Sequence, residues 1–170
     1  LTQALQTKYG FEQVIASDLY QKPDFNGNFE ILDGTNFNQL HEIVVRHGIT
    51  QIYHLAAILS ANGEKDPLRT WDINMKALLN VLEVGRIESI DKIFYPSSIA
   101  VFGKGIPKEN VGQDVVLNPT TVYGISKMAG EKWCEYYFDK HGVDVRSIRY
   151  PGLISWKTPA GGGTTDYAVE

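Results

Sequence analysis

The sequence predicts an α/β protein: a doubly wound, open parallel sheet with helices on both faces. Short apolar runs typical of buried strands alternate with amphipathic helical segments along the chain, and this alternation produces parallel β/α units. Polar or small residues follow directly after several of the strand-like runs. Ligands of such sheets bind beyond the carboxyl ends of the strands. The residues at those ends are therefore the first candidates for a functional site.

The first part of the chain predicts two helices and three strands. Apolar residues recur at helical spacing in two segments, and a glycine that can end a helix follows each of them, Gly10 and Gly48. Short apolar runs such as Val14-Ile15-Ala16 predict strands. In chain order, we expect a helix over residues 1–9, strands over 12–17 and 29–32, a helix over 37–47 and a strand over 50–57.

The second part predicts two long helices, each followed by a strand. Asp66-Pro67 has the pattern of an N-cap with proline in the first turn, and Gly142 can end the later helix. We expect a helix from 66 to about 83, a strand over 92–97, a helix over 121–141, a strand over 143–150, an irregular segment over 151–163, and a new helix from Thr164.

Composition narrows the classes of function. The chain has 170 residues, 43% of them hydrophobic, and a net charge of -4, which fits one globular domain and indicates neither nucleic acid nor an anionic membrane as partner. No apolar run reaches the roughly 18 residues of a membrane span, and no signal peptide pattern opens the chain. The single cysteine, Cys134, lies in an apolar helical stretch and predicts a buried, inert thiol. We expect a cytoplasmic protein without a disulfide or a metal site.

The most informative motif is Tyr123-Gly-Ile-Ser-Lys127. Residues four apart on a helix lie on one face, and a nearby ammonium lowers the pKa of a phenol from its ordinary value of about 10. Tyr123 is therefore a candidate general base for removing a proton from an alcohol. The same spacing also occurs on ordinary helix surfaces. Ser98, after the strand that ends in Pro96-Ser97, is a candidate partner that orients the alcohol, and its alternative role is to cap a turn.

Two aspartates at strand ends are candidates for binding a dinucleotide. Asp18 follows its strand directly, where a carboxylate can bind an adenosine ribose and repel the 2′-phosphate of NADP. Asp33 follows the next strand, where it can accept a hydrogen bond from an adenine amine. The alternative for Asp18 is a solvated loop residue, and for Asp33 an Asx turn beside Gly34.

The third strand ends in His54-Leu55-Ala56-Ala57, whose small residues let a flat ring approach the backbone. His54 itself is interpreted as a packed, hydrogen-bonded histidine. Asn74 lies inside a helix, where asparagine is disfavoured; it either ties the helix to the loop before it or lies on the surface. Gly161-Gly162-Gly163 can form a hinge, and the Thr164-Thr165-Asp166 segment that follows is explained by helix capping alone.

In order and approximate spacing, these residues resemble the extended short-chain dehydrogenase/reductase superfamily, which includes the UDP-galactose epimerases. The resemblance covers nearly the whole chain and implies a Rossmann-type fold. Three stretches resemble the bacterial short-chain type L-threonine 3-dehydrogenases more closely: His54 to Gly63, Pro96 to Gly103, and Arg149 to Ser155 with Pro159 to Glu170.

That resemblance implies oxidation of L-threonine at Cβ to 2-amino-3-oxobutanoate, with NAD as the cofactor. Tyr123 would remove the hydroxyl proton, Ser98 would orient the hydroxyl, and Lys127 would hold the nicotinamide ribose. The implied NAD contacts are Asp18, Leu19, Asp33, His54, Leu55, Ala56, Ala57, Asn74, Tyr123, Lys127, Tyr150, Pro151 and Ile154. The implied substrate contacts are Ser60, Ser98, Tyr123, Thr164, Thr165 and Asp166.

One family feature is missing from the sequence. Members begin with a strand and a glycine-rich turn that binds the pyrophosphate, whereas Leu1 falls inside the helix that should follow that turn. Because that strand occupies the centre of the family's sheet, we expect a gap in the sheet, filled by a longer polypeptide or by another segment. Residues 1–150 are then an NAD-binding domain, and 151–170 are the start of a truncated substrate lobe.

Two alternative functions stay open at this point. A UDP-sugar 4-epimerase would use the same tyrosine, lysine and serine, and a non-catalytic NAD-binding regulator usually loses one of them. Oligomeric state is also open. Trp133, Tyr136 and Tyr137 either form a homodimer surface on their helix or pack on the sheet.

Overall fold

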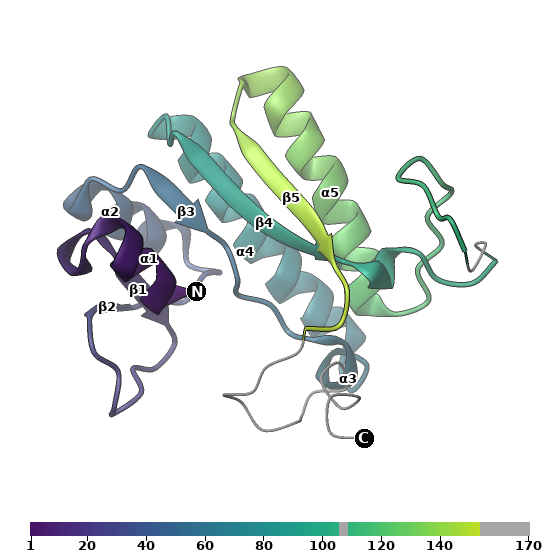
Figure 1. The fold of residues 1–170 in the computed structure, drawn as a ribbon, viewed down its shortest axis with the longest axis horizontal. Coiled ribbons are helices and arrows are strands. Elements are labelled where there is room, and N and C mark those ends of the chain that lie inside the picture. The colour runs from purple at the N-terminus through teal and green to yellow at the C-terminus, as the bar shows by residue number, and fades with distance from the viewer. Residues whose placement is uncertain (106–108, 154–170) are drawn as a thin grey trace.

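The computed structural model describes residues 1–105 and 109–153, and Figure 1 shows their arrangement. The strands in this part of the chain are β1 Ile15–Asp18, β2 Asn28–Ile31, β3 Gln51–Tyr53, β4 Lys92–Ser98 and β5 Val145–Tyr150. The helices are α1 Thr2–Tyr9, α2 Phe37–His47, α3 Ser60–Gly63, α4 Pro67–Ile87 and α5 Val122–His141, with 3₁₀ turns η1 Phe11–Gln13 and η2 Ile99–Val101.

The strands form two separate parallel sheets. One pairs β1 with β2, and the other has the order β3-β4-β5. Among the described residues no strand joins β1 to β3. The α/β class with parallel strands is therefore confirmed, and the expected gap lies between the two sheets (Figure 1).

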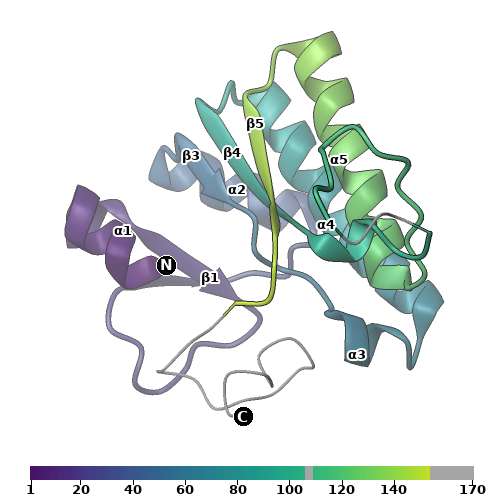
Figure 2. The ribbon, with the colours of Figure 1, turned by 45° about the vertical axis from the view of Figure 1, so that its right-hand side comes forward.

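Helices lie on opposite faces of the strands. α4 and α5 pack together and against β4, behind the larger sheet in Figure 1, whereas α1 lies on the near side, toward β3. Figure 2, turned by 45°, shows the same separation between α1 and the α4–α5 pair.

β4 alternates strictly between the two faces of its sheet. Ile93, Tyr95 and Ser97 are buried, and the residues between them are half-buried. The buried side chains join the apolar faces of α4 and α5 in one core, with Leu78, Leu82 and Val84 fully enclosed. Burial on this scale is the main favourable contribution to folding, and it fixes β4 and α5, which carry the candidate catalytic residues, against each other.

Cys134 belongs to this core. Its side chain is buried, and burial raises the pKa of the thiol to about 12. The prediction of a buried thiol is confirmed.

Several helix ends follow the predicted local signals. Gly48 and Gly142 adopt left-handed conformations, with φ of 57° and 70°, after α2 and α5. Glycine reaches such φ values without the steric cost that a side chain brings. Asp66 caps α4 by accepting a hydrogen bond from the amide of Arg69 at 3.2 Å.

Other predicted boundaries were wrong. β1 starts at Ile15 because residues 11–13 form a 3₁₀ turn after Gly10. β3 ends at Tyr53, four residues early, because the chain then leaves the sheet toward Ile58, whose backbone is bonded to Asn74. α4 continues to Ile87 rather than 83, and the short helix α3 was not predicted.

The aromatic residues of α5 divide between surface and interior. Trp133 and Tyr136 are exposed, with ring centroids 5.7 Å apart. The half-buried Tyr137 donates a hydrogen bond to Glu83 of α4 at 3.1 Å.

None of the helices in the described residues has the length and apolarity needed to cross a membrane.

Candidate active site

Tyr123 and Lys127 lie in the first turns of α5, whose start is fixed by its cap: the hydroxyl of Thr121 accepts a hydrogen bond from the amide of Gly124 at 3.0 Å. The Lys127 ammonium is 5.6 Å from the centroid of the Tyr123 ring. It is buried and donates a hydrogen bond to the carbonyl of Pro96 in β4 at 2.7 Å. The structure therefore brings the predicted tyrosine and lysine together beside the end of β4.

The pKa values of this pair differ from the prediction. Burial lowers the pKa of Lys127 to about 8. Burial raises the pKa of Tyr123, and interaction with the Ser98 side chain offsets part of that rise. The predicted lowering of the phenol pKa by Lys127 is therefore wrong for this structure, because desolvation of a largely buried phenol favours its neutral form.

Ser98 caps a turn, which is the alternative considered for it, and its role in orienting an alcohol stays a prediction. It is the last residue of β4, and its hydroxyl oxygen accepts a hydrogen bond from the amide of Ala100 at 3.2 Å, which caps the η2 turn. The same side chain interacts with Tyr123. The turn cap therefore keeps the Ser98 hydroxyl at the end of β4.

Tyr95 lies under this site and was not predicted. The Lys127 ammonium is 4.5 Å from the centroid of its ring, within the range of a cation–π interaction. The ring of His54 stacks on the same tyrosine, with centroids 6.2 Å apart. A Cβ at Gly130 of α5 would collide with the Tyr95 hydroxyl, so this glycine lets the helix approach β4 closely. No sequence signal marked Tyr95, because it follows Ile93 and Phe94 in an apolar run without alternation.

The packing predicted for His54 is confirmed. It is buried after β3, and burial together with the charge of Lys127 lowers its pKa to about 4. The imidazole is therefore neutral near pH 7. Leu55 and Ala56, which follow it, are exposed.

The two aspartates differ in their surroundings. Asp18 ends β1 and is exposed, as is Leu19, whose amide donates to the Asp18 carboxylate at 2.7 Å. Asp33 forms the Asx turn considered as its alternative, because it accepts hydrogen bonds from the Thr35 hydroxyl at 2.8 Å and amide at 2.9 Å. These bonds hold the pKa of Asp33 below its ordinary value.

Asn74 points inward and ties α4 to the preceding loop. Its amide group accepts from the Ile58 amide at 2.8 Å and donates to the Ile58 carbonyl at 3.1 Å. It also lies 3.4 Å from the hydroxyl of Ser126, which donates to the carbonyl of Tyr123 at 2.8 Å. Asn74 thus links the loop after β3 to the turn of α5 that carries Tyr123.

The remaining predicted site residues are placed as follows. Ser60 opens α3, and Tyr150 ends β5 with its ring edge-on to Phe94. Pro151 is exposed directly after β5. Ile154, Thr164, Thr165 and Asp166 lie outside the described residues. In the part of the chain that the structure describes, no cluster of three His, Cys, Asp or Glu residues is arranged to hold a metal ion.

Known proteins resemble this chain in sequence and structure. The NAD dependent epimerase/dehydratase family matches residues 1–165. An uncharacterized epimerase/dehydratase from Staphylococcus haemolyticus is 48% identical over 166 residues, which cover 95% of this chain and 52% of that protein.

Two solved structures superpose with a TM-score of 0.95. One is a partial consensus L-threonine 3-dehydrogenase, 58% identical, in a match that covers 99% of this chain and 55% of that one. The other is the holo form of a GalE-like L-threonine dehydrogenase from Cupriavidus necator, 54% identical, with 98% and 55% covered. The chain spans about half the length of these relatives. On the match over residues 1–165, it belongs to the NAD dependent epimerase/dehydratase family.

Proposed function

We propose that this chain carries the NAD-binding and catalytic residues of an L-threonine 3-dehydrogenase, which oxidises L-threonine at Cβ to 2-amino-3-oxobutanoate. The observation that carries the proposal is the grouping of Tyr123, Lys127 and Ser98 at the end of β4. Two structures that resemble the chain at more than half identity are L-threonine dehydrogenases, and this supports the choice of substrate.

Several described residues support a dinucleotide as the cofactor. An ammonium has three N–H donors, and among the described residues Lys127 uses one of them, to Pro96; the others can bind ribose hydroxyls. Asp18 is exposed at the end of β1, where a ribose would lie. Leu55 and Ala56 after β3 are exposed and would lie near the bound cofactor. NAD, when bound, supplies the acceptor for the hydride that leaves Cβ.

The chain's own residues would hold the alcohol and move its proton. Ser98 orients the threonine hydroxyl, and the Tyr123 phenol oxygen takes the proton as the Cβ–H bond breaks. The phenolate must form first; burial of Tyr123 opposes this step, and the Ser98 side chain favours it. Ser60 and residues 164–166 are proposed to bind the amino and carboxylate groups of the substrate.

A UDP-sugar 4-epimerase is the second candidate, because it would use the same three side chains. An absorbance assay for NADH, run on the intact protein with L-threonine, L-serine and a UDP-sugar side by side, separates the two. We expect NADH to accumulate with L-threonine. Epimerisation of the UDP-sugar without NADH accumulation from threonine would overturn the proposal in favour of the epimerase.

A further inference from the structure

We infer that the ion pair between Glu131 and Arg149 is a positioning device, which holds Ser98 and the end of β5 in register against Tyr123. Neither residue was assigned a role in the site. The expected kinetic effects rest on the proposed function, whereas the expected structural effect does not.

The pair has the geometry of a specific, largely enclosed interaction. Arg149 Nε donates to Glu131 Oε1 at 2.9 Å, and Arg149 Nη2 donates to Oε2 at 2.8 Å. The two side chains are only 19% and 11% exposed. Bidentate pairing fixes orientation as well as distance. Although burial opposes ionisation, hydrogen bonds from Arg149 and Ser97 hold the pKa of Glu131 below its ordinary value.

Glu131 binds one residue in each of two neighbouring strands, directly before a proposed site residue. Ser97 also donates to Glu131 Oε1, at 2.5 Å, and Ser97 and Arg149 are register partners between β4 and β5. The next register pair is Ser98 with Tyr150. One carboxylate on α5 therefore binds both strands directly before the residues that form the proposed site.

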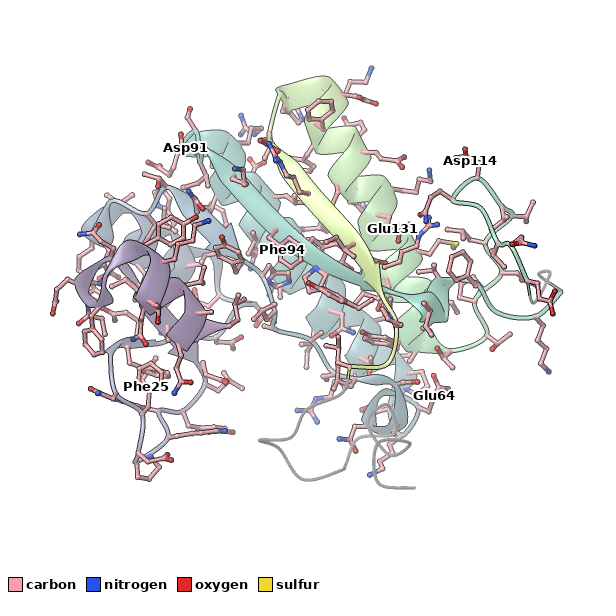
Figure 3. The ribbon with its side chains drawn as sticks, viewed as in Figure 1. Phe25, Glu64, Asp91, Phe94, Asp114 and Glu131 are labelled. Atoms are coloured by element: carbon pink, nitrogen blue, oxygen red, sulfur yellow. The ribbon has the colours of Figure 1, made fainter. Side chains whose placement is uncertain are left out.

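Glu131 also lies one helical turn beyond Lys127 on α5, so the same helix presents the lysine and the carboxylate to β4. Figure 3 shows Glu131 on the side of α5 that faces the loop carrying Asp114. A shift of α5 along the sheet would thus move Tyr123 relative to Ser98 unless this pair opposed it.

Arg149 extends the contact to the segment between β4 and α5. Its Nη1 donates to the Gln113 carbonyl at 3.2 Å and to the Gln113 side chain at 3.3 Å. Its guanidinium lies 5.3 Å from the centroid of the Phe102 ring, just beyond η2. The arginine therefore holds four parts of the fold: α5, β5, the turn after Ser98 and the following loop.

The test compares Arg149→Met with Arg146→Met in the intact protein. Arg146 is the matched control, because it lies on the same strand but pairs with Asp144 at the surface, with 64% of its side chain exposed. Stability is measured first, and kcat and KM are then measured where each variant is fully folded. We expect Arg149→Met to lower kcat about tenfold or more with KM for L-threonine nearly unchanged, as misplacement of reacting groups does, and Arg146→Met to leave both unchanged.

A spectroscopic measurement tests positioning without any activity. With ¹³Cζ-labelled tyrosine, the Tyr123 signal is assigned as the one lost in Tyr123→Phe. We expect Arg149→Met to move this signal and its titration midpoint, because the phenol loses its placement against Ser98, and Arg146→Met to leave both in place. Arg149→Lys and Glu131→Gln serve as milder variants if Arg149→Met does not fold, and smaller movements in the same direction are expected.

The outcomes separate the two proposals. If the wild-type protein does not oxidise L-threonine but Tyr123 responds to Arg149, the proposed substrate is wrong and the positioning role stands. An unchanged Tyr123 signal in the Arg149 variants would overturn the inference whatever their activity. Lower stability with an unchanged Tyr123 signal and unchanged kcat would assign the pair to stability alone.

Discussion

The carboxylate of Glu64 accepts a hydrogen bond from the backbone amide of Val122 at 2.8 Å, across 58 positions of the chain. Glu64 follows α3, the helix that Ser60 opens, and Val122 is the first residue of α5, next to Tyr123. A carboxylate at the start of a helix satisfies an amide that has no partner within the helix, and it interacts favourably with the helix dipole. This hydrogen bond therefore joins the region of α3, which begins at the proposed substrate residue Ser60, to α5, which carries the proposed base Tyr123.

Removing this contact should lower stability by a modest, measurable amount. We expect Glu64→Ala to reduce the free energy of unfolding by about 1 kcal/mol, as the loss of a helix cap does. Urea unfolding measures the change. Glu135→Ala is the control, since Glu135 lies late in α5 and pairs with Lys132 at the exposed surface. Equal effects of the two substitutions would show that the hydrogen bond to Val122 adds no more stability than the exposed ion pair of Glu135.

Tyr123→Phe should abolish hydride transfer and leave NAD affinity within a few-fold of wild type. The ring keeps its packing near Lys127, but phenylalanine has no oxygen to accept the hydroxyl proton. Initial rates of NADH formation and NAD titration by fluorescence measure the two quantities. A parallel loss of binding and turnover would contradict a role confined to proton removal.

Asp18→Ala should weaken NAD binding and relax the rejection of NADP. The exposed carboxylate at the end of β1 would lose both its hydrogen bonds to the ribose and its repulsion of a 2′-phosphate. The ratio of kcat/KM for the two cofactors reports the change. Asp24→Ala, an exposed aspartate in the loop after β1, is the control. A cofactor preference that Asp18→Ala leaves untouched would remove this residue from the site.

His54 should make the fold sensitive to acid. Its pKa of about 4 in the folded protein lies below the ordinary 6.5, so the unfolded chain binds a proton that the folded chain rejects as the pH falls from 6.5 to 4. Stability from this group is complete above pH 6.5 and falls by about 3 kcal/mol across that window.

Urea unfolding at pH 7 and pH 4 measures this loss. We expect His54→Phe, which keeps a ring against Tyr95, to lose about 3 kcal/mol less than wild type between the two values. His41→Phe, at a more exposed histidine paired with Glu88, should retain the wild-type loss. The same acid sensitivity in His54→Phe would rule out this histidine as its source.

Local signals made much of the fold predictable from the sequence. Helix ends depend on a residue's own conformational freedom or on a side chain three positions from the amide it caps, as at Gly48, Gly142 and Asp66. The end of β3 was not predicted, because it depends on where Asn74, far along the chain, holds Ile58.

The residues of the candidate site were predicted from residue type and order, but the residues that hold them in place were not. Tyr123, Lys127 and Ser98 came from a short motif and a strand end. Glu131 contacts Ser97 and Arg149, which are 34 and 18 positions away, and nothing local marks such pairs. The direction of the Tyr123 pKa shift was also missed, because it depends on how deeply packing buries the phenol.

The buried thiol of Cys134 can serve as a chemical probe of local opening in the core. It is the only thiol in the sequence, and it belongs to the hydrophobic core in which α5 packs against α4 and β4. An alkylating reagent needs both access and a thiolate, so modification requires an opening of the core that exposes the Cys134 sulfur. The labelling rate, measured against that of the unfolded chain, thus gives the free energy of this opening motion, and a ligand bound at the end of β4 should slow it.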